Sequence, residues 1–103
     1  MQFKFSYMYR DGANYKNHGE VIISNPDNVS LVEALERLQL CLIDEMYFYA
    51  HTLGVPDLHF PHWNDLYDHS WHEFVALEET QEPPTVEWSI SDFLNNCESL
   101  LKN

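Results

Sequence analysis

Aromatic residues occupy every second position at the start of the chain. The four are Phe3, Phe5, Tyr7 and Tyr9. Because successive side chains of a β-strand point to opposite faces, this alternation predicts a strand over residues 2–9 with one aromatic face. Such a face has to be buried against a second layer, so the chain is expected to fold as a sheet that other elements cover.

A second strand and a helix are predicted to follow. Residues 19–24, which include a Val-Ile-Ile run, predict a strand that forms a hairpin with the first. Ser30 and Glu33 have the spacing of a helix capping box, and leucines then recur at every third or fourth position. These signals predict a helix over residues 31–43.

The middle of the chain contains a segment of mixed character, a loop and a strand. Residues 46–53 are rich in aromatics and fit either a strand or a continuation of the helix. Residues 57–69 have no clear period, which predicts a loop. Residues 71–79 are typical of a strand with two partly apolar faces, so either His72 or Glu73 should point into the protein.

A last helix is predicted to begin at Ser89 or Ser91, where apolar residues start to recur at helical spacing. The resulting order is ββαββα in a single domain over residues 1–103. We expect an α+β two-layer sandwich, with both helices on one face of a four-stranded, mainly antiparallel sheet. Cys41 and Cys97 lie on apolar helix faces and indicate buried hydrophobic residues rather than a disulfide.

Negative charge is concentrated in the second half of the chain. The formal net charge is −12, and residues 38–101 contain twelve Asp and Glu but no Lys or Arg. Phosphate contacts need basic side chains, so direct binding to nucleic acid or to an anionic membrane is not expected. No apolar run approaches the roughly 20 residues of a membrane span, and we expect a cytoplasmic protein.

Residues 57–73 form the densest cluster of ionisable and aromatic side chains. Eight of these seventeen residues are His, Asp or Glu. Aromatic side chains among carboxylates would suit a surface that selects a basic protein, as an antitoxin, an immunity protein or a regulatory module does. We therefore predict an acidic protein-binding module rather than an enzyme, with a homodimer through the uncovered sheet face as a further form of association. The predicted contact residues in this segment are Trp63, Asp65, Tyr67, Asp68 and Trp71.

Histidine spacing suggests an alternative that involves a metal. The sequence contains His59-x-x-His62 and His69-x-x-His72. Imidazole is a frequent ligand of zinc and non-haem iron, and Asp57 or a neighbouring carboxylate could complete such a site. This pattern predicts a small metal-dependent hydrolase or another metalloprotein that holds zinc or another divalent metal. The competing interpretation is that these histidines are structural and bind nearby carboxylates.

Arg10 and Lys16 flank the first turn and suggest a second alternative. Together they could bind a small anion such as a carboxylate or a phosphate. They could equally form ion pairs with the acidic half of the chain.

Two stretches resemble a group of small bacterial proteins that are common in cyanobacteria. The stretches are Tyr9-Arg10-Asp11-Gly12-Ala13-Asn14-Tyr15-Lys16, followed by Gly19-Glu20-Val21, and Trp71-His72-Glu73-Phe74. The resemblance covers most of the chain and implies a small cytoplasmic bacterial protein. No activity is established for the group, so the resemblance implies nothing about a substrate.

Overall fold

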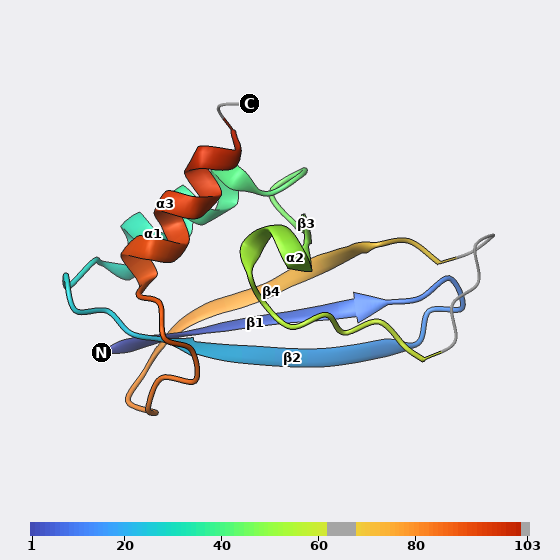
Figure 1. Ribbon diagram of the computed structural model, residues 1–103, viewed down its shortest axis with the longest axis horizontal. Helices are drawn as coiled ribbons and strands as arrows, with labels where there is room; N and C mark the ends of the chain where they lie inside the picture. The colour runs from blue at the N-terminus through green and yellow to red at the C-terminus, as the bar shows by residue number, and fades with distance from the viewer. Residues whose placement is uncertain (62–67, 102–103) are drawn as a thin grey trace.

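The computed structural model describes residues 1–61 and 68–101, which form an α+β fold (Figure 1). Its elements in chain order are β1 (Gln2–Arg10), β2 (Lys16–Ile23), α1 (Leu31–Cys41), β3 (Tyr47–Tyr49), α2 (Ala50–Leu53), β4 (Trp71–Thr80) and α3 (Ile90–Leu100). The observed order departs from the expected ββαββα by the one-turn helix α2, which lies between β3 and β4.

The four strands form one antiparallel sheet in the order β2-β1-β4-β3, so the predicted antiparallel sheet is confirmed. β1 is central and pairs with β2 on one side and β4 on the other. Its register with β4 shifts between Ser6 and Tyr7, where Val75 is an extra residue in β4. Such a bulge bends a strand and increases its local twist.

Several element boundaries differ from the sequence prediction. β2 begins at Lys16 rather than at residue 19, because its first residues are largely exposed and have no apolar alternation to mark them. Helix α1 ends at Cys41 instead of residue 43. Residues 46–53 contain the strand that the sequence suggested, β3, but the helix α2 that follows it is separate from α1 and does not continue the first helix.

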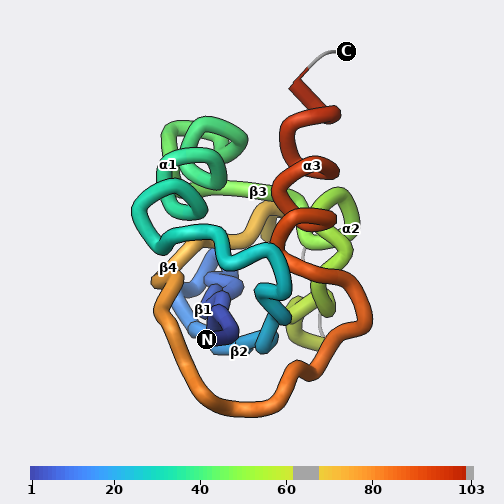
Figure 2. The backbone as a smooth tube through the Cα atoms, turned by 90° about the vertical axis from the view of Figure 1, so that its left-hand side faces the viewer, coloured from blue at the N-terminus to red at the C-terminus, as the bar shows by residue number. Residues whose placement is uncertain are grey.

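Helices α1 and α3 cover the aromatic face of β1 near the N-terminus. Figure 2 shows the two helices side by side above the sheet, where they pack against each other. Phe3 and Phe5 are fully buried below them, and the ring of Phe93 on α3 meets Phe5 edge-on with centroids 5.5 Å apart. The hydrophobic core therefore lies at this end of the sheet.

Side chains at the first turn of each long helix fix where it begins. The hydroxyl of Ser30 accepts the backbone N–H of Glu33 at α1. At α3, Ser89 and Asp92 form a reciprocal capping box, which satisfies two backbone N–H groups that have no partner within the helix. The helix start predicted at Ser89 or Ser91 thus falls at Ser89.

The opposite face of the sheet is partly covered by the connector between β4 and α3, which passes beneath the sheet (Figure 2). Thr85 in this connector donates its backbone N–H to the carbonyl of Ile22 at 2.9 Å. The Thr85 hydroxyl accepts the Ile22 N–H at 2.8 Å. These bonds pair the backbone groups of Ile22 on the edge strand β2. Ile22 is buried although it points away from the main core.

Beyond the helices, a segment without regular structure covers the aromatic face. Residues 54–61 leave α2 and run along the sheet towards the β1–β2 hairpin (Figure 1). The Leu58 side chain rests on Gly19 of β2, where a Cβ atom would lie 3.0 Å from it. Glycine at position 19 thus allows the segment to approach the sheet closely.

Both cysteines are free thiols. Cys97 is buried, and burial raises the pKa of its thiol to about 12. Cys41 is only half-buried, so the sequence prediction overstated its burial. No helix within the described residues is long and apolar enough to cross a membrane.

Candidate functional site

A cluster of two histidines and one aspartate lies at the end of the sheet beyond α1 and α3. We name it the histidine cluster, and it consists of Asp57, His59 and His72. Asp57 and His59 belong to the segment after α2, whereas His72 is on β4. His72 lies opposite Phe48 of β3 and points to the aromatic face, and its side chain is 1% exposed. The prediction that His72 or Glu73 points inward is met by His72.

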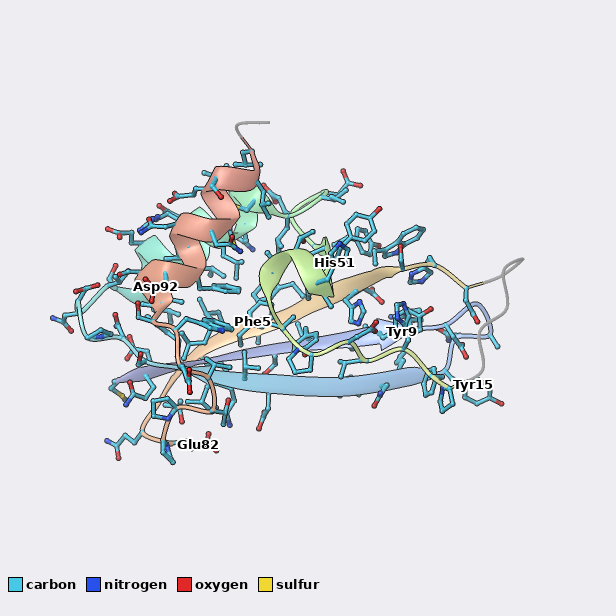
Figure 3. The ribbon with its side chains drawn as sticks, in the orientation of Figure 1. Phe5, Tyr9, Tyr15, His51, Glu82 and Asp92 are labelled. Atoms are coloured by element: carbon cyan, nitrogen blue, oxygen red, sulfur yellow. The ribbon has the colours of Figure 1, made fainter. Side chains whose placement is uncertain are left out.

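Aromatic rings surround the buried imidazole. The ring of His72 lies 5.2 Å from that of Tyr9 and 5.9 Å from that of Phe48, measured between centroids. Figure 3 shows Tyr9 on β1 at this end of the sheet, away from the helices that cover Phe5. These contacts, together with its place in β4, restrict the position and orientation of the His72 ring.

Asp57 links the two imidazoles. Its two carboxylate oxygens lie 2.6 and 2.7 Å from Nδ1 of His59, and the first of them also lies 3.4 Å from Nε2 of His72. The other ring nitrogen of His59 lies 3.3 Å from the carbonyl oxygen of His69. Both nitrogens of His59 thus lie near oxygen acceptors.

The tautomer of His72 follows from its hydrogen bonds. The backbone N–H of Leu58 donates to Nε2 of His72 at 3.0 Å, so Nε2 carries a lone pair. In the neutral ring the proton is then on Nδ1, a buried atom that has no well-aligned partner among the described residues. Nε2 of His72 therefore already accepts a hydrogen bond, and the Asp57 oxygen that lies 3.4 Å from it is a second acceptor.

Protonation of the cluster is governed by burial and charge. Burial lowers the pKa of His72, and the nearby His59 lowers it further, although the charge of Asp57 opposes both. Burial raises the pKa of Asp57, but hydrogen bonds and charge from His59 lower it by more, so its pKa lies below the usual value. The folded protein thus favours a neutral His72 beside an ionised Asp57.

The structure brings together two of the four predicted metal ligands. His59 and His72 converge, and the third member of the cluster is Asp57, which the sequence had suggested only as a supporting carboxylate. The ring of His69 stacks on Trp71 with centroids 4.0 Å apart instead of joining the cluster. His62 lies outside the described residues.

The predicted protein-contact residues are dispersed. Asp68 accepts the backbone N–H of Gly12 at 2.9 Å and so ties its segment to the β1–β2 turn. Trp71 lies on the opposite face of the sheet from the histidine cluster and is 40% exposed. The other three residues, Trp63, Asp65 and Tyr67, lie outside the described residues.

Trp71 belongs to an exposed apolar surface that the sequence did not predict. We name this surface the Trp71 patch, and its members are Ile43, Asp44, Tyr47, Tyr49 and Trp71, which line a shallow depression of about 380 Å³. Tyr49 lies opposite Trp71 across β3 and β4, and the Tyr47 ring meets the Trp71 ring edge-on at 6.5 Å. The alternation Tyr-Phe-Tyr at residues 47–49 was the available signal, because it places both tyrosines on the face opposite to Phe48.

Basic side chains are mostly engaged in internal ion pairs. Arg10 donates from Nε to Glu73 at 3.0 Å and from a second nitrogen to the Asn14 side chain. Lys4 pairs with Glu82 at 2.6 Å, and this bond raises the pKa of Lys4 and lowers that of Glu82. Arg37 on α1 likewise pairs with acids on the helices. Lys16 is exposed and forms no ion pair with the described residues.

No protein-family model matches the chain, and neither a curated protein nor a solved structure is significantly similar to it.

Proposed function

We propose that this chain is an acidic protein-binding module that contacts a basic protein through the Trp71 patch and the carboxylates around it. The observation that carries this proposal is that three large exposed apolar side chains line the same depression. Ile43 is 51% exposed, Tyr49 is 37% exposed and Trp71 is 40% exposed. Clustered apolar side chains of this kind often mark interaction surfaces, and Trp and Tyr are frequent hot-spot residues.

Two carboxylates at the rim of the patch support a basic partner. Asp44 and Glu45 are exposed and follow Ile43 in the turn that leads to β3. Both have left-handed backbone conformations, with φ of 53° and 59°. This conformation costs an L-residue roughly 1 kcal/mol. Strain of this kind persists most often at functional positions, where it holds side chains in a required place.

The overall charge favours a basic protein over a second copy of the chain. Three of the five basic residues already form ion pairs with acids of the same chain. They therefore contribute little positive charge that could attract the acidic surface of a second copy. Two copies would each bring a formal charge of −12. Repulsion between them opposes association, whereas a basic partner would be attracted and its approach accelerated.

Binding of a small anion at Arg10 and Lys16 has less support. Two nitrogen atoms of Arg10 are committed to Glu73 and Asn14, so an anion would have to displace these contacts. The protein-binding module is proposed to act in the cytoplasm, the compartment in which free thiols such as Cys41 and Cys97 are the rule.

The test begins with affinity capture from the source organism and continues with a purified pair. A captured protein is identified, produced separately and titrated with wild type, Ile43→Ser, Trp71→Ser and the Asp44→Asn/Glu45→Gln double variant. Val32→Ser is the matched control, because Val32 is 66% exposed but lies at the start of α1, outside the patch.

We expect a positively charged partner whose Kd rises at least tenfold with each patch variant and rises with NaCl, while the control binds as wild type. Equal binding by wild type and the three patch variants would refute the proposal. Sedimentation of the isolated chain as a dimer that these variants dissociate would replace the basic partner with a second copy.

A further inference from the structure

We propose that Asp57, His59 and His72 form a binding site for a divalent first-row transition metal, with zinc or iron(II) as the matching ions. The site is independent of the Trp71 patch, because it lies on the other face of the sheet. Its three potential ligand atoms all lie within 4.8 Å of one another. Within residues 1–61 and 68–101 no other group of His, Cys, Asp or Glu side chains converges in this way.

The types of ligand fit these metals. Two imidazoles and one carboxylate form a ligand set that occurs in catalytic zinc sites and in non-haem iron(II) proteins. Both ions keep positions open for water or substrate when three protein side chains bind them. The side chain of Asp57 is 59% exposed, so the open positions would face solvent at this end of the sheet.

His72 is already prepared to act as a ligand. The hydrogen bond from Leu58 fixes the tautomer with a lone pair on Nε2, which is the form that binds a metal through this atom. The aromatic neighbours of His72 hold the ring in place, so little side-chain freedom would be lost on binding.

A cation would also remove an unfavourable contact. Nε2 of His72 and an oxygen of Asp57 are both acceptors, and they lie only 3.4 Å apart. A tetrahedral ion with bonds of roughly 2.1 Å places its ligand atoms roughly 3.4 Å apart, which matches this separation. The metal would thus bind between two groups whose spacing needs little adjustment.

His59 would have to move more than the other two ligands. Its Nδ1 lies 2.7 Å from Asp57, which is a hydrogen-bond distance and shorter than the separation of two metal ligands. Binding would release the proton shared with Asp57 and would replace the Leu58 hydrogen bond to His72. Because Asp57 and His59 lie on a segment without regular structure, a shift of less than 1 Å is feasible there.

The experiment uses the full chain without a histidine tag, after a chelator has removed any bound metal. Zinc is titrated by calorimetry, and iron(II) is titrated without oxygen in a parallel arm. The test variants are Asp57→Asn and His59→Gln, which remove one ligand each from partly exposed positions. Circular dichroism establishes that each variant is folded before titration.

Three matched histidine variants serve as controls. His18→Gln and His51→Gln remove exposed histidines outside the cluster. His69→Gln removes a histidine whose backbone carbonyl lies near His59 but whose ring is not part of the cluster, so metal binding should persist. If His69 rather than the cluster held the metal, this variant would lose binding while Asp57→Asn would retain it.

We expect one metal ion per chain and a melting temperature that rises with metal concentration. The Kd should rise at least tenfold in Asp57→Asn and in His59→Gln and change less than twofold in the three controls. The proposal would be overturned if the wild type showed no saturable binding. It would also be overturned if both test variants bound the metal with the affinity of the wild type. The arm with the lower Kd identifies the preferred ion.

Discussion

The two ends of the aromatic face of β1 are covered in different ways. At the end near the N-terminus, Phe5 lies under helices α1 and α3 (Figure 3), and Phe3 on the same face of β1 is also fully buried. At the other end, Tyr7 and Tyr9 lie under chain segments without regular structure. The Tyr7 hydroxyl donates to the carbonyl of Pro56 at 2.6 Å, and that of Tyr9 donates to the carbonyl of His69 at 2.7 Å.

Whether β1 has Phe or Tyr at each of these positions follows from the hydrogen-bonding needs of the segment that packs on it. Carbonyl groups in the middle of a helix are satisfied within the helix, so a phenyl ring is sufficient below it. Carbonyl groups in an irregular segment need donors from elsewhere when they are buried. The tyrosine hydroxyls provide those donors, and this polar end of the sheet is also where the histidine cluster lies.

The largest expected effect comes from truncating the helix-covered end. Phe5→Ala removes a ring that contacts Phe48, Phe74 and Phe93, and should lower the free energy of unfolding by about 3–5 kcal/mol. Urea unfolding followed by circular dichroism measures the loss. Val75→Ala, at a half-exposed position in β4, should change stability by less than about 0.5 kcal/mol. Similar losses in both variants would contradict the packing described for this end.

A smaller effect is expected from Tyr7→Phe at the loop-covered end. The substitution leaves the carbonyl of Pro56 without this donor and should cost about 0.5–1.5 kcal/mol, the net contribution of a typical hydrogen bond. Hydrogen exchange should accelerate most in residues 54–61 and least in α1 and α3. Uniform acceleration across the chain would show that the two ends unfold as one unit.

Alkaline pH should reduce the difference in the free energy of unfolding between the wild type and Tyr7→Phe. Burial raises the pKa of Tyr7 to about 12, whereas an unfolded tyrosine titrates near pH 10. The folded wild type therefore keeps a proton that the unfolded chain loses, and its stability falls as pH rises from 10 to 12. At pH 11 the difference in the free energy of unfolding between the two proteins should be about 1 kcal/mol smaller than at neutral pH. Tyr15→Phe, at a 69% exposed position, is the matched control for general effects of alkaline pH on the protein.

The smallest effect is expected at the ion pair between α1 and α3. Arg37→Gln removes a pair with Glu98 on a largely solvated surface and should cost roughly 0.2–1 kcal/mol. The cost should decrease further in 0.5 M NaCl because salt screens exposed charges. A thermal unfolding series with and without salt measures both values. A loss as large as that of Phe5→Ala would mean that charge rather than packing holds the helices together.

Much of the fold could be predicted because its signals are local. Alternation over residues 2–9 marked β1, and the capping residues Ser30 and Ser89 marked the starts of α1 and α3. Helix α2 was missed because one turn is too short to show a helical period. The early start of β2 was missed because Lys16 and His18 are exposed and give no apolar signal.

The candidate site was harder to predict because it depends on contacts between distant segments. Period-two alternation indicated that His72 or Glu73 points inward, and His72 does. Nothing in the spacing of His59 and His69 shows that one ring joins the cluster while the other stacks on Trp71. That difference is set by the path of the segment after α2 across the sheet, which a single sequence does not encode in any local pattern.

Nitrogen NMR of the uniformly labelled, untagged protein tests most directly whether the loop-covered end is a binding end and the helix-covered end is purely structural. On addition of one equivalent of zinc, the imidazole signals of His59 and His72 should shift, together with backbone signals of residues 57–60. Signals of α1 and α3 should remain unchanged. Shifts at His18 or His51 in place of these, or no shifts at all, would contradict the account.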